Sequence, residues 1–314
     1  MMKSVNQISM SAIMMAAACL FTGCEKENEN TVDNQPVKAR ITSTIDGMAT
    51  RAAGTAWAPG DRIGVYAKKD AQEIRINAPY VTTAGDGEFT AEGNEFYFQD
   101  KKDVNFTAYY PFAGADGTAP GTGGIISKTI TADDQTPAAQ PKIDYLFAAQ
   151  ITANSANPNV QFRFDHCMSR IVLKFLPGNG ITALDDIQYT LNGILPAGTF
   201  NTLTGSAAAD DATSAAPLTM SVPGSAATEL SSALIFFPQQ SGAEKKLTLT
   251  MRGTEYSATF KFKENPNNNN VCELAAGHTY TYNVKINNTS MTISPATVNP
   301  WEEGGSENIN SSNN

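Results

Sequence analysis

The residues best suited to nucleophilic chemistry are neighbours in one segment, Asp165-His166-Cys167. A cysteine can act as a nucleophile when a histidine base lies within hydrogen-bonding reach of its thiol. The surrounding stretch from Val160 to Phe175 alternates between apolar and polar residues, which predicts a strand or two strand halves with a bulge between them. Adjacent residues of a strand point to opposite faces, so the two side chains cannot meet. We therefore expect a structural role for His166.

The second histidine, His278, follows Gly277 in a predicted turn before a tyrosine-rich strand. The simplest interpretation is a hydrogen-bonding turn residue. A metal site shared with His166 would need further ligands, and the sequence contains neither a Cys-x-x-Cys motif nor a four-ligand zinc pattern. The sequence therefore predicts no metal and no cofactor.

Two pairs of neighbouring acids, Asp133-Asp134 and Asp185-Asp186, could supply the two carboxylates that glycoside hydrolysis requires. Neighbouring side chains in a loop diverge, so solvated turn residues are the favoured interpretation. A glycine-rich loop around Gly121 lacks the Gly-Lys-Ser/Thr ending and the following helix of a phosphate-binding loop. Because no nucleophile, base and metal set converges, we expect that the protein is not an enzyme.

The aromatic and thiol residues have similarly plain interpretations. Trp57 and Trp301 could stack on sugar rings, but one opens a strand and the other precedes an acidic tail, so packing in the core or at a seam is expected. Cys167 and Cys272 have different flanking sequences, which favours a free buried thiol at each. Pairing of the two stays open at this stage.

The amino terminus is typical of a signal peptide that is removed. Lys3 precedes an apolar stretch from Ile8 to Phe21, shorter than the ~20 apolar residues of a membrane span. It ends in Leu20-Phe21-Thr22-Gly23-Cys24, which resembles the bacterial lipobox, where the cysteine thiol receives diacylglycerol. This predicts that residues 1–23 are a lipoprotein signal peptide and that Cys24 is the lipidation site, acylated with palmitate-type chains. Each buried methylene of such chains contributes ~0.8 kcal/mol to membrane anchoring.

Residues 24–37 form a predicted flexible acidic tether. Acidic residues behind the lipidated cysteine resemble the export signal that sends lipoproteins to the outer face of the outer membrane in bacteria of the gut-anaerobe kind. We therefore expect a surface-exposed lipoprotein of the outer membrane, although a plain solvated linker would have a similar composition.

Composition excludes two other classes of protein. The formal net charge is -9 and the few Lys and Arg residues do not cluster, whereas a nucleic-acid partner calls for a basic face. The later apolar runs are short and interrupted, so no second membrane segment is expected.

Strand signals dominate the rest of the chain. Short segments with period-two alternation recur at ~8–12-residue spacing with turn residues between them, which predicts an all-β sandwich or barrel. The predicted strands are 41–45, 61–67, 88–91, 96–99, 104–110, 125–130, 160–175, 187–191, 198–203, 218–222, 233–237, 247–251, 255–263 and 279–286. A loop is predicted over 111–124 and an interdomain connection over 148–159. We expect two β-sandwiches in tandem, at 38–155 and 156–300, followed by a polar disordered tail at 301–314.

Several phrases in order resemble one family. They are Arg40 to Ile45, Thr50-Arg51, Trp57 to Tyr66, Ala108 to Pro111, Ile143 to Ala148, Phe164 to Ser169, Phe237 to Gln239, Leu274 to Tyr280 and Pro300-Trp301. Together they resemble the fimbrillin (Mfa-like, FimA-like) surface lipoproteins of Bacteroides-type anaerobes. The resemblance implies two transthyretin-like β-sandwich domains and a role in type V pili or as a related surface adhesin.

The resemblance also implies a mechanism of assembly. An Arg- or Lys-specific protease would cut after Arg51, where small residues make the bond accessible, and would release the strand formed by Arg40, Ile41, Thr42, Ser43, Thr44 and Ile45. The vacated groove would then accept a strand from another subunit. The segment from Met291 to Val298 could serve as a donor strand, but the tail after Trp301 contains a single aliphatic residue. This favours a tip or accessory subunit over a stalk subunit.

The leading hypothesis is thus a fimbrial subunit that partners other fimbrial subunits and acts in cell adhesion. The alternative is a monomeric surface adhesin that binds host matrix or glycan without polymerising. It would be favoured if the strand from Arg40 to Ile45 stays in place and Arg51 is not cut.

Overall fold

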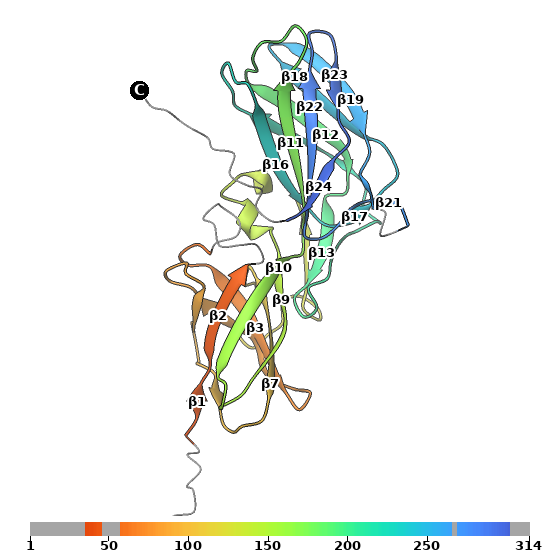
Figure 1. Ribbon diagram of the computed structural model, residues 1–314. Coiled ribbons are helices and arrows are strands. Elements are labelled where there is room, and N and C mark those ends of the chain that lie inside the picture. Colours follow the sequence, from red (N-terminus) through yellow and green to blue (C-terminus); the bar gives the residue numbers. More distant parts are fainter. Residues whose placement is uncertain (1–34, 46–56, 266–268, 302–314) are drawn as a thin grey trace, which may run out of the picture. The chain divides into compact units, whose positions relative to one another are not determined.

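The computed structural model describes residues 35–45, 57–265 and 269–301 of the 314-residue chain (Figure 1). The predicted signal peptide, Cys24, most of the predicted tether, Arg51 and the tail after Trp301 lie outside the described residues. Over the described part no helix has the length and the hydrophobicity needed to cross a membrane. The predicted all-β class is confirmed, because strands and two short 3-10 helices, η1 (Asp133–Gln135) and η2 (Gln140–Lys142), make up the regular structure described.

The first half of the described chain forms a closed barrel. Its strands are β2 (Arg40–Ile45), β3 (Arg62–Lys69), β4 (Gln72–Val81), β5 (Glu88–Ala91), β7 (Val104–Tyr110), β9 (Leu146–Ala153) and β10 (Asn159–His166). They are hydrogen-bonded in the order β10-β2-β5-β4-β3-β7-β9, and β9 pairs with β10 to close the path. A short antiparallel pair, β1 (Val37–Lys38) and β6 (Tyr97–Phe98), lies outside this path.

The second half contains two larger sheets. One has the order β16 (Leu230–Phe236), β11 (Ser169–Pro177), β22 (His278–Ile286), β23 (Met291–Ile293), and β24 (Thr297–Pro300) also pairs with β22. The other has the order β15 (Ala216–Val222), β12 (Ile187–Ile194), β18 (Lys245–Met251), β19 (Thr254–Phe260). Alternate residues of both sheets, among them Leu173, Tyr189, Leu249 and Tyr282, belong to one buried cluster. Such alternation along strands of two sheets is the packing of a β-sandwich.

Two three-stranded sheets complete the described structure. One has the order β17 (Gln239–Gln240), β21 (Val271–Leu274), β20 (Glu264–Asn265). The other has the order β14 (Ala207–Ala209), β13 (Ala197–Asn201), β8 (Ile125–Thr129), so the chain before the predicted boundary pairs with the chain after it. A separate buried cluster accompanies this pairing, in which the Tyr145 and Phe200 rings stack at 4.7 Å between centroids.

The passage from the barrel to the second group of sheets differs from the sequence-based expectation. The predicted connection at 148–159 contains most of β9 and the turn into β10. β10 pairs with β2 and β9, and its Phe162 and Phe164 side chains fill the barrel core. In its hydrogen bonding the chain leaves the barrel between His166 and Ser169 rather than near 155. The division into two independently folding domains stays a prediction.

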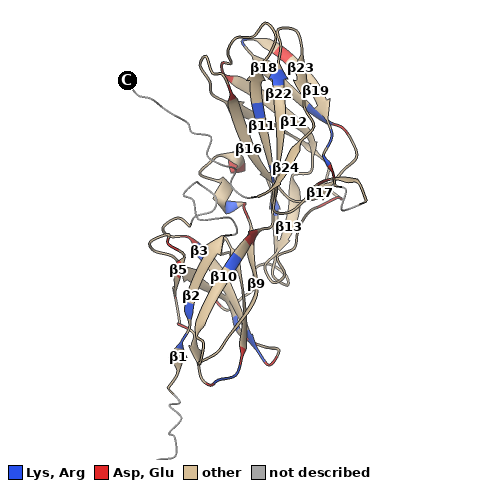
Figure 2. Ribbon diagram, in the orientation of Figure 1, with Lys and Arg blue, Asp and Glu red and all other residues tan. Residues whose placement is uncertain are grey.

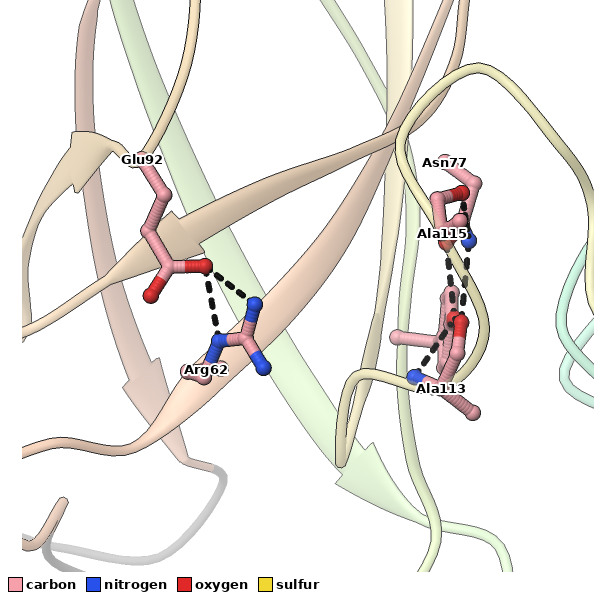
Figure 3. A network of polar contacts seen from close by, with 6 residues as sticks. Arg62, Asn77, Glu92, Ala113 and Ala115 are labelled. Carbon is pink, nitrogen blue, oxygen red and sulfur yellow. Dashed lines mark hydrogen bonds and ion pairs between the residues drawn. The ribbon is translucent and has the colours of Figure 1, made fainter.

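A buried asparagine holds the loop that follows β7. Asn77 lies in β4, and its side-chain amide donates hydrogen bonds to the carbonyl oxygens of Ala113 (2.9 Å), Ala115 (3.1 Å) and Thr118 (2.9 Å). The Tyr109 hydroxyl in turn donates to Asn77 Oδ1 at 2.7 Å. Figure 3 shows the Asn77 amide directed at the loop, together with the ion pair between Arg62 of β3 and Glu92, which follows β5. These bonds satisfy carbonyls of a predicted loop that makes few ladder bonds of its own.

Candidate strand-exchange site

The amino-terminal strand β2 is an integral part of the barrel core. Its apolar residues alternate with polar ones, as predicted, so Ile41 and Ile45 point inward and are only 4% and 6% exposed. Ala39, which precedes the strand, is buried in the same cluster. Removing two such isoleucines from an apolar core costs about 2 kcal/mol each. The strand therefore contributes to the stability of the barrel although it lies at the start of the described chain.

Strand β2 lies between β5 and β10, and the two neighbours hold it differently. It runs parallel to β10 over six positions, from Arg40 opposite Asn159 to Ile45 opposite Phe164. It runs antiparallel to β5 over two positions only. Among the described barrel strands, β2 and β10 form the one parallel pair. Loss of β2 would open the barrel and leave the facing edges of β5 and β10 without hydrogen-bond partners.

Gly87 allows the chain before β5 to approach β2 closely. The Ser43 amide donates a 2.8 Å hydrogen bond to the Gly87 carbonyl oxygen. A Cβ atom at Gly87 would lie 2.4 Å from the Ser43 carbonyl oxygen, and the residue has a φ of +84°. Both the space and the backbone conformation therefore require glycine at this position.

Trp57, where the described chain resumes after β2, packs beneath the same strands. Its ring makes edge-to-face contacts with Phe89 of β5, Phe164 of β10 and Tyr110 of β7, at centroid distances of 5.2, 5.2 and 5.3 Å. The predicted core role of Trp57 is thus confirmed. The tryptophan bridges the two strands that flank β2, so it would remain as an anchor between them if β2 were withdrawn.

Strand β2 also contains one poorly satisfied group. The Ser43 hydroxyl oxygen is buried and makes no hydrogen bond to any residue that the structure describes. A buried polar atom without a partner lowers stability by roughly 1–3 kcal/mol. β2 therefore fills its groove with one buried hydroxyl left unsatisfied, which lowers the stability of its packing.

This gives a prediction for Ser43→Ala. The substitution removes the unsatisfied hydroxyl without adding volume, so the free energy of unfolding is expected to rise by about 1 kcal/mol. Urea denaturation followed by tryptophan fluorescence measures this change. The matched variant Thr44→Ala, at an exposed position of the same strand, should leave stability within ~0.5 kcal/mol of the parent. A loss of stability in Ser43→Ala would contradict the assignment of an unsatisfied hydroxyl.

The residues that first suggested catalysis have structural surroundings. His166 is buried, its Nδ1 lies 3.0 Å from Asp144 Oδ1, and its ring stacks on Trp301 at 4.5 Å between centroids. The Cys167 thiol instead lies 3.7 Å from the Asp165 carbonyl oxygen. Burial raises the pKa of this thiol to about 12, which keeps it protonated and unreactive near neutral pH. His166 thus packs against Trp301 and Asp144, as a structural residue would, and a purely structural role stays a prediction.

The other candidates also stabilise local structure. His278 Nδ1 lies 2.7 Å from the Ala276 carbonyl oxygen, the turn contact expected. Asp134 accepts bonds from Lys128 and Thr131, Asp185 accepts one from Arg252, and Asp186 accepts one from the Gly224 amide. Cys167 and Cys272 are both free, which resolves the question left open by the sequence.

Trp301 is ordered, contrary to its assignment to a disordered tail at 301–314. Its ring is buried between His166 and the Arg170 guanidinium, whose carbon lies 5.0 Å from the ring centroid. Its amide donates to the Gly277 carbonyl oxygen at 2.6 Å. The packing role expected for Trp301 is confirmed, because an indole buries a large apolar area even where the residues that follow it in the sequence are polar.

No group of three or more His, Cys, Asp or Glu side chains suited to a metal ion occurs among the described residues. The site that the structure offers is therefore one of backbone edges and apolar pockets, in an all-β barrel that the amino-terminal strand β2 closes.

Comparison with known proteins assigns this all-β chain to a family. The family described as fimbrillin-like matches residues 50–301, so the chain belongs to the fimbrillin-like family, as the sequence phrases indicated. The chain is similar to the crystal structure of a candidate cell adhesion protein from Bacteroides ovatus, with 34% identity, a TM-score of 0.74, and coverage of 85% of this chain and 98% of that one.

Two more distant structures share the fold. A candidate cell adhesion protein from Bacteroides uniformis is 22% identical, with a TM-score of 0.62 and coverage of 84% of this chain and 98% of that chain. One from Parabacteroides distasonis is 9% identical, with a TM-score of 0.52 and coverage of 85% and 97%. Comparison with curated protein sequences gives no match.

Proposed function

We propose that this chain is a cell-surface fimbrial subunit of a type V pilus that acts in cell adhesion and accepts a strand from a neighbouring subunit. Membership of the fimbrillin-like family and the similarity to the Bacteroides ovatus protein support a fimbrial or adhesive role. The observation that carries the strand-accepting part is the position of β2, which closes the barrel between β5 and β10 and precedes Arg51 in the chain.

The physical argument concerns the barrel after β2 has left. A cut after Arg51 separates Arg40 to Ile45 covalently from the rest of the chain, so the strand is then held by noncovalent contacts alone. Once it dissociates, β10 has an unpaired edge and the core has two vacated isoleucine pockets. An extended segment with apolar residues at alternate positions fits such an edge by β-augmentation. The incoming strand and the displaced strand compete for the same backbone hydrogen bonds in the barrel.

The carboxyl-terminal end supports a tip or accessory position. Met291 and Val298, which belong to the possible donor segment, lie in β23 and β24 and pack with the core of the second half. Donating this segment would break the β22–β24 ladder and remove Trp301 from His166 and Arg170. A subunit that accepts a strand without donating one keeps these contacts.

The proposal includes the location and the chemical class of the protein. Lipidation at Cys24 would anchor the chain to the outer membrane and expose it at the cell surface. The protein would act as a structural, non-enzymatic component without a cofactor.

The amino terminus of the protein in surface material tests this proposal. We expect mass spectrometry of sheared high-molecular-weight fibres to find chains that begin at Ala52, because cleavage after Arg51 precedes strand exchange. Arg51→Ala should leave the chain uncut and reduce its incorporation into fibres at least tenfold. The matched variant Arg75→Ala, which keeps Arg51, should be cut normally.

A chain that still begins at lipidated Cys24 in all fractions would instead support the alternative, a monomeric surface adhesin for host matrix or glycan. One observation favours keeping this alternative: with β2 in place the barrel is closed and its described strands are paired. Fractionation for fibres then separates an uncleaved anchor subunit from a stand-alone adhesin.

A further inference from the structure

A pocket of about 400 Å³ is lined by residues of β3, β4, β6 and β7 and of the segments that flank β6, and by none of β2 or β10. Its inner wall contains Phe96, Phe98 and Val104, which are 7%, 2% and 3% exposed. Ile74 and Tyr97 also line it, and they are 40% and 45% exposed. These are two of the three large apolar side chains that are exposed in the described part of the chain. An aromatic ring and an aliphatic side chain held in solvent around a concave surface are features of a ligand site.

All but one of the charged side chains that line the pocket form an ion pair with a side chain of opposite charge. Lys69 donates to both carboxylate oxygens of Asp100, at 3.0 and 2.8 Å. Glu95 accepts a 2.7 Å bond from Lys38 of β1. Lys102 lies 3.3 Å from Asp70. Each of these cations thus already has a carboxylate partner.

Arg75 is the exception. Its guanidinium is half-buried in the pocket wall and makes one long hydrogen bond, 3.4 Å, to the Glu95 carbonyl oxygen. Within the described residues it forms no ion pair. A guanidinium has five N–H donors in a planar fork that matches a carboxylate, so most of the donors of Arg75 are available. On a chain with a formal net charge of -9, an uncommitted cation in a pocket is a specific feature.

Figure 2 shows that positive and negative residues are interspersed over the part of the ribbon that is coloured, without a continuous basic stripe. Arg75 is therefore better suited to a single carboxylate than to a polyanion. On the rim, the Gln99 side-chain oxygen and the lone pair that remains on Asp100 Oδ2 beside its bond from Lys69 can accept from hydroxyl groups, and the ring of Tyr97 offers an apolar face. A ligand with one carboxylate, several hydroxyls and an apolar face uses all of these groups.

We propose that this pocket binds an acidic sugar, with the sugar carboxylate on Arg75, the apolar face of the sugar ring on Tyr97 and the hydroxyls on Gln99 and Asp100. A simple aliphatic or aromatic acid would use Arg75 and Tyr97 but would leave the rim acceptors unmatched. The site is complete in the chain that keeps its amino-terminal segment and does not require removal of β2. Release of that segment would also take β1 from β6 and Lys38 from Glu95, so the proposed site belongs to the uncleaved chain and serves adhesion directly.

Titration of the intact chain, from Pro36 onward, with free sugars tests the proposal. We expect saturable binding of N-acetylneuraminic acid or glucuronic acid in the millimolar range, followed by protein NMR, and at least tenfold weaker binding of glucose and N-acetylglucosamine. Arg75→Gln should weaken binding of the acid about tenfold, and Tyr97→Ala at least threefold. The control Lys246→Gln, at an exposed position of β18, should bind like the parent.

Folding of each variant is checked by its thermal melting curve. Tyr97 is 45% exposed, so Tyr97→Ala still tests the site if Arg75→Gln proves unstable. Equal affinity for acidic and neutral sugars, unchanged affinity in the folded variants, or no saturable binding up to tens of millimolar would overturn the proposal. Tighter binding of N-acetylphenylalanine than of both acidic sugars would overturn the sugar assignment in favour of a peptide carboxylate.

Discussion

The Gly64→Ala variant is expected to lose about 3 kcal/mol of unfolding free energy, a large effect for a single methyl group. A Cβ at Gly64 of β3 would lie 2.2 Å from Tyr109 Cε1 and 2.6 Å from Asn77 Oδ1. Tyr109 is fully buried and cannot move without breaking its hydrogen bond to Asn77. The methyl group therefore disturbs the three bonds from Asn77 to the 111–124 loop as well as the core. Thermal unfolding should show a midpoint roughly 10 °C lower.

The control for this variant is Gly242→Ala. A Cβ at Gly242 meets no atom within 4 Å, and its φ lies outside the left-handed region. Stability should stay within ~0.5 kcal/mol of the parent, because the same residue types are exchanged without a clash. Similar stability of the two variants would mean that Tyr109 and Asn77 can rearrange at little cost.

A disulfide between β2 and β5 is expected to prevent strand exchange, and reduction of this disulfide is expected to restore it. Thr42 and Glu88 are directly opposite each other in the antiparallel pair, and both side chains reach solvent. The double variant Thr42→Cys/Glu88→Cys therefore places two thiols at a separation that a disulfide can span. A Cys272→Ser background removes the partly exposed free thiol. Fibre formation on cells, measured as high-molecular-weight species without reductant, should fall to background.

The stapled pair needs a control that also contains a disulfide. Val81→Cys/Thr90→Cys joins β4 to β5, which both stay in the barrel during exchange, so fibres should form normally. If the variant with the β2–β5 disulfide forms fibres at the parent level, the strand-exchange proposal is wrong, because β2 would then not need to leave the barrel. Recovery after reduction separates a locked strand from a misfolded protein.

The positions of most strands followed from the sequence. The segments at 41–45, 88–91 and 104–110 match β2, β5 and β7 to within one residue, because buried apolar residues recur among more exposed polar ones. In β7 this pattern ends at Ala108, after which Tyr109 and Tyr110 are buried as well. β4 was not predicted. Its first three residues are exposed and Pro79 interrupts the later part, so neither half shows a period of two strong enough to indicate a strand.

The neighbours of each strand could not be predicted in the same way. The alternation from Val160 to Phe175 changes phase at Cys167-Met168, which is compatible with a bulge within one sheet, although β10 and β11 belong to different sheets. Period-two alternation states that one side of a strand is buried but not against which strand. The boundary expected near 155 therefore fell on the Ala- and Asn-rich turn rather than at Cys167-Met168.

The candidate sites differ in how far the sequence indicated them. The strand from Arg40 to Ile45 was identified by its alternation and by family resemblance, and Trp57 was assigned to the core. The Arg75 pocket had no sequence signal, because Ile74, Arg75, Tyr97 and Asp100 come from separate segments and are ordinary surface residue types.

The sequence by itself determined the all-β class, the fimbrillin-like family and the burial of Ile41 and Ile45. These follow from local alternation, from residue types and from ordered phrases, all of which are written along the chain. Only the tertiary structure decided that β2 closes a barrel between β5 and β10 and that Trp301 is held by His166 and Arg170. It also decided that, among the residues described, the Ser43 hydroxyl makes no hydrogen bond and Arg75 forms no ion pair. Each of these depends on which distant segments become neighbours, and that choice is made by the packing of the whole core rather than by any one segment.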